Sequence, residues 1–157
     1  MRGQIFSIDL FIAIAVFIVV FWFYILTWER LTLSLKEVQA MKGFEALALS
    51  ISDSLVRFPG APERWEENVS NVSAIGLAYA HVFDKNKIRN FTSLDYNRTK
   101  KLIGLDGYEF YFKVYYLNRS VFAYHGNAPV NFKQAVSTKR FGLLEGEAVV
   151  MELTIWD

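Results

Sequence analysis

Residues 10–28 read LFIAIAVFIVVFWFYILTW, and 18 of these 19 residues are apolar. A helix needs about 20 apolar residues to cross a bilayer, and Ile5, Phe6 and Ile8 lengthen the run. Elsewhere 65 of 138 residues are apolar, which is an ordinary share for a globular domain. The sequence therefore predicts one transmembrane helix over 10–28 joined to one modest domain, and it excludes a transporter with several spans.

The flanks of the apolar run favour a retained anchor over a secretory signal that is removed. Signal peptides have shorter apolar cores with a small-residue cleavage site behind them, whereas Glu29-Arg30-Leu31 follows here. Arg2 favours a cytoplasmic location for the short leader segment 1–9, although Arg30 and Lys36 on the far side weaken that preference.

Asparagine usage indicates the orientation more strongly. Five of the eight asparagines carry the Asn-x-Ser/Thr glycosylation signal, and all five lie beyond the apolar run. Random placement would give about one, because Ser and Thr are minor residues in average proteins. We therefore expect an extracellular, glycosylated domain, the alternative being chance enrichment in polar loops. The five are Asn68, Asn71, Asn90, Asn97 and Asn118.

The helical pattern continues past the membrane run. Apolar residues recur every three or four positions as far as Phe58, with charged residues between them. This spacing predicts an amphipathic helix over 29–58, ended by Pro59-Gly60, that packs one apolar stripe on an extracellular α+β domain over 59–157.

Within that domain, residues 59–80 are expected as a surface loop. Asp84 is expected to cap a short helix ending at Arg89, and Ser93 or Asp95 to begin another that reaches Leu105. Strands are predicted over 108–117, 119–125, 130–140 and 147–156. The predicted fold class is α+β, a long N-terminal helix packed on a small antiparallel sheet, with the four strands in a meander.

Composition excludes several kinds of chemistry. The 17 basic and 16 acidic residues leave no basic excess for nucleic acid, and the absence of cysteine excludes a thiol nucleophile and disulfides. His81 and His125 are isolated, and the calcium-loop-like start at Asp84 fails because Ile88 takes a ligand position. We expect no catalytic, cofactor-binding or metal-binding residues, and therefore no enzyme.

Two further features have more than one interpretation. Trp65 is expected to anchor the loop against the domain, the alternative being a platform for a ligand, and Glu66-Glu67 are expected as solvated charges. The strand 108–116 alternates faces, so half of its aromatic rings are expected in the core, and the other half would be free to form a contact surface.

The residues before the apolar run carry a resemblance to a known family. Residues 2–9, RGQIFSID, resemble the class III signal peptide of archaeal type IV pilin-like proteins, in which a basic-Gly pair precedes Gln, Ser and an acidic residue. The resemblance implies cleavage between Gly3 and Gln4 by a prepilin-type peptidase. It also implies an assembly role for Asp9, paired with the free amine of a neighbouring chain. The Gln4-to-Ser7 spacing here is one residue longer than the family pattern.

Asp9 has a simpler alternative as a carboxylate at the membrane interface, near Arg2 or the amino terminus. A second resemblance lies downstream: residues 59–66, 75–78 and 108–111 (PGAPERWE, IGLA and YEFY) resemble a pattern of archaeal anchored proteins with pilin-like starts.

These observations lead to one leading function and two rivals. We expect a single-pass, membrane-anchored, extracellular-facing pilin-like or minor pilin-like structural subunit, or a related envelope protein, acting in surface filament assembly or adhesion. Its expected partners are the membrane, further copies or other pilin-like subunits, and a prepilin-type peptidase, with no cofactor and no nucleic acid. The first rival is an anchored envelope domain that binds a partner or ligand without assembling, and the second is an anchored enzyme.

Overall fold

The computed structural model describes residues 2–157, except for the side chains of residues 2–7, 34, 36, 37 and 40. The chain forms two compact units that divide between Lys42 and Gly43. The division lies inside helix α1 (Arg2–Arg57), within the predicted amphipathic segment 29–58. The helix ends just before Pro59-Gly60, as predicted, because proline disfavours helical backbone in the residue before it.

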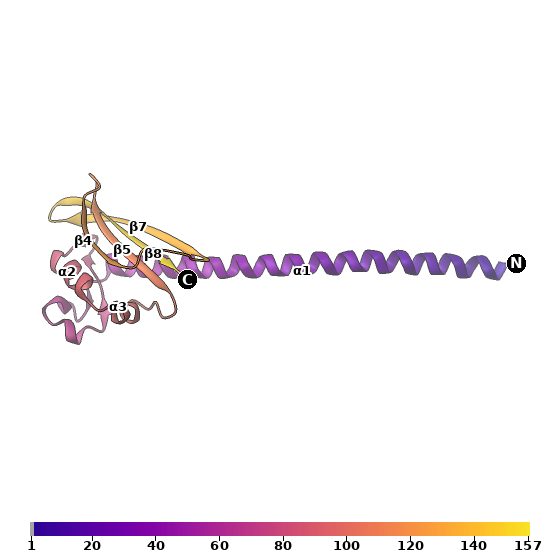
Figure 1. Ribbon diagram of the computed structural model, residues 1–157, viewed down its shortest axis with the longest axis horizontal. Helices are drawn as coiled ribbons and strands as arrows, with labels where there is room; N and C mark the ends of the chain where they lie inside the picture. Colours follow the sequence, from indigo (N-terminus) through magenta and orange to yellow (C-terminus); the bar gives the residue numbers. More distant parts are fainter. Residues whose placement is uncertain (1) are drawn as a thin grey trace. The chain divides into compact units, whose positions relative to one another are not determined.

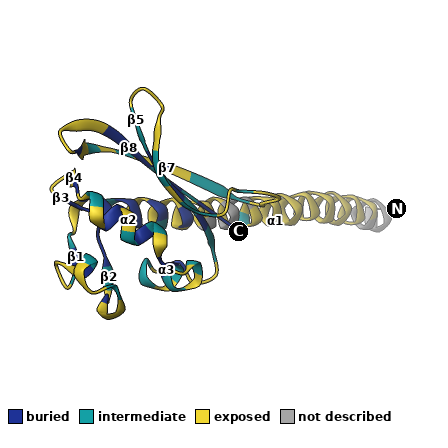
Figure 2. Ribbon diagram, turned by 60° about the vertical axis from the view of Figure 1, so that its left-hand side comes forward, coloured by how far each residue is buried: buried dark blue, intermediate teal, exposed yellow. Residues whose placement is uncertain are grey.

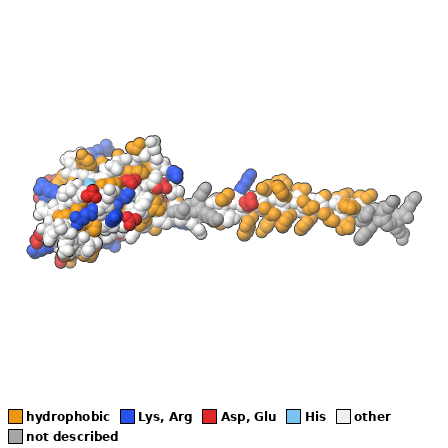
Figure 3. Space-filling model, turned by 60° about the horizontal axis from the view of Figure 1, so that its bottom comes forward, with side chains coloured by type: hydrophobic (Ala, Val, Ile, Leu, Met, Phe, Trp, Pro, Cys, Tyr) orange, Lys and Arg blue, Asp and Glu red, His pale blue; other side chains and the backbone are white. Residues whose placement is uncertain are grey.

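The first unit is the N-terminal part of α1. Its segment Ile8–Leu33 is 26 residues long with a mean hydropathy of 2.8 and no buried part, so it is long and apolar enough to cross a membrane. Figure 3 shows the apolar side chains of this segment in orange. The hydroxyls of Thr27 and Thr32 donate to the carbonyls of Phe23 and Trp28 at 2.8 and 2.6 Å, so these polar groups are satisfied within the helix.

The second unit contains the rest of α1 and all the other elements (Figure 1). Two short helices, α2 (Lys85–Ser93) and α3 (Tyr96–Leu102), carry the predicted caps. The Asp84 carboxylate accepts from the backbone N–H groups of Asn86 and Lys87, and Asp95 accepts from that of Arg98. The Asp84 cap is confirmed, and of the two alternatives for the second helix Asp95 is the cap, whereas Ser93 ends α2; α2 extends four residues past Arg89, and α3 stops at Leu102.

Four longer strands form most of the sheet. They are β5 (Glu109–Tyr116), β6 (Val121–Gly126), β7 (Ala135–Leu144) and β8 (Glu147–Trp156). The predicted bounds of β5, β6 and β8 agree with the structure to within two residues. Strand β7 begins five residues later than the predicted start at Val130, and it continues through Gly142 to Leu144. The turn to β8 is consequently only Glu145-Gly146, where both residues have positive φ.

The predicted meander is wrong. The strand order is β3-β4-β7-β8-β5-β6, so β8 lies between β7 and β5, and β6 and β7 are not neighbours. The physical reason is the apolar content of β8, where Val149, Val150 and Met151 are all buried, which suits a strand with a neighbour along each edge. The sheet is also mixed, because β4 (Val82–Phe83) pairs in parallel with β7.

The core lies between one face of this sheet and the helices. Phe110, Phe112 and Val114 alternate inward along β5 and face Ile155, Leu153 and Met151 of β8 in register. α1 contributes Phe44, Ala48, Ile51, Leu55 and Val56, and α2 contributes Ile88 and Phe91 to the same cluster. Figure 2 shows this buried layer in dark blue, which confirms an α+β domain with an apolar stripe of α1 on the sheet.

The prediction of a surface loop over 59–80 is wrong. This stretch contains the short strands β1 (Gly60–Ala61), β2 (Ala74–Ile75) and β3 (Ala78–Tyr79), and two turns of 3₁₀ helix at Trp65–Glu67 and Val69–Asn71. The segment is held against α1, where the Leu77 amide donates to the Leu55 carbonyl at 2.9 Å. A Cβ on Gly76 would lie 1.7 Å from the Phe58 carbonyl oxygen, so only glycine permits this close approach.

Candidate functional site

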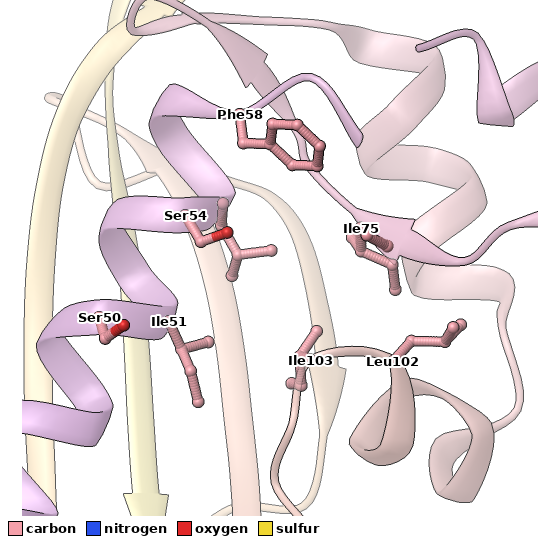
Figure 4. Close-up of a pocket in the computed structure, with 9 residues that line it drawn as sticks. Ser50, Ile51, Ser54, Phe58, Ile75, Leu102 and Ile103 are labelled. Atoms are coloured by element: carbon pink, nitrogen blue, oxygen red, sulfur yellow. The ribbon is translucent and has the colours of Figure 1, made fainter. Parts of the chain in front are cut away.

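A pocket of about 230 Å³ opens between the C-terminal part of α1, strand β2 and the end of α3. Figure 4 shows Ile51, Phe58 and Ile75 around it, with the hydroxyls of Ser50 and Ser54 as its polar groups. Its lining carries no titratable side chain, so it offers shape and two hydroxyls but no acid or base. Its volume is below the usual range for a small-molecule site.

A cluster of hydrogen-bonded polar side chains joins α3 to β5. The Tyr96 hydroxyl donates to Oε2 of Glu109 at 2.5 Å, and it accepts from the Phe110 backbone amide at 3.1 Å. Lys100 Nζ donates to Oε1 of Glu109 at 2.8 Å. Burial, reinforced by the Glu109 carboxylate, raises the pKa of Tyr96 to about 12, while the hydrogen bond from Lys100 holds the pKa of Glu109 below its ordinary value. The cluster therefore holds helix α3 against strand β5 of the sheet.

His125 lies beside this cluster among aromatic rings. Its ring centroid is 5.4 Å from that of Phe91 and 5.6 Å from that of Phe110. Nε2 is 3.2 Å from Oγ1 of Thr99, whose own proton is donated to the Asp95 carbonyl. Thr99 can thus only accept here, which places a proton on Nε2. Burial lowers the pKa of His125, and the nearby Asp95 carboxylate opposes this only in part.

We expect stability to fall with decreasing pH because of His125. A pKa that is lower in the folded state means that the neutral form stabilises the fold above about pH 6.5, and that this contribution is lost as pH falls below that value. The Tm of the full chain, followed by circular dichroism, should fall more steeply between pH 7 and pH 5 than that of His125→Gln. Glutamine keeps an N–H donor for Thr99 but does not titrate.

The matched control is His81→Asn. His81 is exposed with φ of 69°, a backbone conformation that asparagine tolerates. This variant should keep the pH dependence of the unmodified chain. Equal slopes for the unmodified chain and His125→Gln would contradict the assignment.

Trp65 and Lys87 are two further buried residues, which the sequence only partly indicated. The Trp65 ring is fully buried, and its Nε1–H donates to the Gly76 carbonyl at 2.9 Å, so the prediction of a loop anchor is confirmed. Lys87 is also buried, and its Nζ donates to the carbonyls of Pro59 and Glu63 at 2.6 and 2.7 Å.

The prediction that both acids after Trp65 are solvated is wrong for the first of them. Glu67 is exposed, but the Glu66 side chain is 15 % exposed, and its Oε2 is buried without a hydrogen bond, 3.8 Å from Lys87 Nζ. Glu66 turns inward because it follows Trp65 in the 3₁₀ turn that brings the indole into the core. Sequence reasoning missed Lys87; its only signal was its place beside Ile88 on the apolar side of α2.

The five predicted acceptor asparagines have different surroundings. Asn68, Asn71, Asn97 and Asn118 are exposed. Asn118 lies in the turn between β5 and β6, where its Oδ1 accepts from the backbone amide and hydroxyl of Ser120 at 2.9 and 2.6 Å. Its amide nitrogen is thus left open to solvent.

Asn90 differs from the other four because its amide is already engaged. It lies half-buried in α2, and its Nδ2 donates to the Glu66 carbonyl at 2.7 Å. In the Asn97 signal, the hydroxyl residue Thr99 is fully buried. The structure therefore distinguishes three acceptor signals whose Asn and Ser residues are both exposed from two in which the Asn or the Thr is partly or fully buried.

The predicted processing and assembly residues lie in α1. Gly3 and Gln4 belong to its first helical turn, and the surroundings of their side chains lie outside the described part of the chain. Asp9 is exposed and lies at the start of the apolar segment Ile8–Leu33. Among the residues with described side chains, no three His, Asp or Glu groups gather closely enough to hold a metal ion.

Comparison with known proteins gives no match to a family model, a curated protein or a solved structure. The resemblance of residues 2–9 to pilin-like leaders therefore rests on those residues alone.

Proposed function

We propose that this protein is a single-pass, membrane-anchored structural subunit of pilin-like build, with its sheet domain outside the cell and the apolar segment of α1 as its anchor and assembly element. The observation that carries the proposal is the segment Ile8–Leu33, which is long and apolar enough to cross a membrane and has no buried part. A membrane or a bundle of like helices would cover its exposed apolar surface.

The build of α1 supports the same proposal. The helix continues without interruption as far as Arg57, and its last turns supply Phe44, Ile51 and Leu55 to the core of the sheet domain. The N-terminal part of this helix is apolar on all sides, and its C-terminal part belongs to the core of the domain. Such a helix suits a subunit that leaves the membrane and assembles through its apolar part. The leader-like residues Gly3, Gln4 and Asp9 and the exposed acceptor asparagines agree with this orientation.

The test is the mass of the native N-terminus. In cells that contain a prepilin-type peptidase, we expect the mature chain to begin at Gln4, having lost Met1-Arg2-Gly3. Intact-mass spectrometry of the chain extracted from membranes measures this directly, and a host without the peptidase is the control in which the leader is retained. An unprocessed chain in the native host would contradict the pilin-like proposal.

Asp9→Ala separates assembly from anchoring. The apolar segment is unchanged by this substitution, so the chain should remain in the membrane pellet, and the domain should keep its circular dichroism spectrum. Assembly into filaments, seen by electron microscopy, should fail if the Asp9 carboxylate pairs with a neighbouring subunit. Normal filaments from Asp9→Ala would refute that pairing.

A non-assembling anchored domain that binds a partner is a second candidate. A groove of about 410 Å³ between α2 and β6 would serve such a domain, as it would serve an assembling subunit.

A further inference from the structure

One edge of the sheet is open at β6. This strand is the last in the order β3-β4-β7-β8-β5-β6 and pairs only with β5. The Asn127 amide donates to the Phe110 carbonyl, which makes Tyr111 and Gly126 a pair without mutual hydrogen bonds. By the alternation of antiparallel ladders, the backbone N–H and C=O of Tyr124 point away from β5, toward the free edge.

A groove follows this edge. About 410 Å³ in volume, it is lined by Arg89 and Thr92 of α2 on one side and by Val121–Tyr124 of β6 on the other. Helix α2 packs beneath β6 through the contact of Phe91 with His125, so the groove has a helix as one wall and a strand edge as the other. An extended chain fits such a site, because it alone can complete the strand ladder.

The side chains around the groove indicate which side chains an added strand would need. Tyr124 is opposite Lys113 in the register, on the face of the sheet away from the core, and it is 66 % exposed. Val121 is 48 % exposed, so an added strand would meet apolar surface on that face.

On the other face, an added strand would meet Arg89. Arg89 is exposed, it is the only charged residue of the lining, and it forms no ion pair with any described carboxylate. Successive residues of a strand point to opposite faces, so the occupant needs apolar side chains in alternation with acidic ones.

We infer that the groove between α2 and β6 binds an extended peptide segment of a partner protein, which adds a strand beside β6 and alternates apolar residues with Asp or Glu. The site is independent of filament assembly. An anchored domain that only binds partners would use it equally.

The experiment uses the full chain in detergent micelles and three fluorescein-labelled hexapeptides, with binding measured by fluorescence anisotropy. The first probe alternates Val and Glu, the second alternates Val and Lys, and the third has three Val followed by three Glu. We expect the Val/Glu probe to bind at least tenfold more tightly than either of the others. Equal affinities for the three probes, or no binding of the Val/Glu probe, would overturn the inference.

Two substitutions test the two walls of the groove. Arg89→Gln should weaken the Val/Glu probe about tenfold and reduce the salt dependence of its binding. Tyr124→Pro removes the outward N–H from an edge strand, where proline is tolerated, and should abolish binding, whereas Tyr124→Thr keeps that N–H and should retain it within a few-fold. Lys101→Gln, an equal loss of charge on the exposed surface of α3, should change nothing.

Two outcomes of the Tyr124→Pro experiment need a separate interpretation. If Tyr124→Pro unfolds, as seen by circular dichroism, the probe comparison and Arg89→Gln still decide between support and refutation. If Tyr124→Pro abolishes only self-association in sedimentation, and the probes do not bind, the occupant of the edge is a second copy of the chain and the inference is wrong.

Discussion

Trp65→Ala should lower the free energy of unfolding of the sheet domain by about 3–5 kcal/mol, the usual cost of removing a fully buried large aromatic side chain. The indole ring is 0 % exposed and holds the 59–76 segment to the domain through its hydrogen bond to Gly76. It also packs on Gly60 so closely that a Cβ there would lie 2.4 Å from the ring. The neighbouring backbone cannot collapse into the cavity, because it is already in close contact with α1.

Chemical denaturation of the full chain in micelles, followed by circular dichroism, measures the change. Trp65→Phe keeps most of the apolar bulk but leaves the Gly76 carbonyl without its donor, so it should cost about 1–3 kcal/mol. Glu67→Ala, an exposed neighbour in the same turn, should stay within about 0.5 kcal/mol. A loss below about 1 kcal/mol for Trp65→Ala would show that the segment contributes little to the fold.

Lys87→Met should destabilise the domain by about 3 kcal/mol, because it removes one member of a buried ion pair and leaves the other. Lys87 Nζ satisfies two backbone carbonyls and lies 3.8 Å from the buried Oε2 of Glu66. With the ammonium gone, the Glu66 carboxylate remains in a site that is largely closed to water. The double variant Lys87→Met/Glu66→Gln should therefore be more stable than Lys87→Met alone.

Lys85→Met is the matched control for this prediction. Lys85 lies in the same helix and forms an ion pair with Glu145 at 2.8 Å, but both side chains are substantially exposed. Water solvates the charge that is left when such a surface pair is broken, so the expected loss is about 1 kcal/mol or less. Equal losses for Lys85→Met and Lys87→Met in denaturant unfolding would refute the buried role of Lys87.

The parts of the fold that depend on local signals could be predicted. The caps at Asp84 and Asp95 follow from the affinity of a short carboxylate for free helical N–H groups, which needs only a few neighbouring residues. The strands β5 and β8 follow from aromatic and β-branched runs, and the end of α1 from Pro59-Gly60. In each case the sequence within one element determines the outcome.

The parts that depend on distant residues could not be predicted. The central place of β8 is determined by its pairing with both β5 and β7, and chain order does not reveal that pairing. Charged residues such as Glu66 and Lys87, within residues 59–90, are normally expected at the solvent-exposed surface. Folding instead buries these two side chains close to each other. The same limit applies to the Tyr96–Glu109 contact and to the β6 groove, since each joins elements that the sequence separates.

The position of β8 also determines when the domain can fold during synthesis. It is the last strand of the sheet to leave the ribosome, yet it holds β5 and β7 together. Until residues 147–156 emerge, β5 and β7 each have an unpaired apolar edge, and no hairpin between them can substitute for the missing strand. We therefore expect the sheet to be completed only late in synthesis, after β8 has emerged. A pause in translation just before Glu147 would prolong the interval in which those edges can pair with other chains.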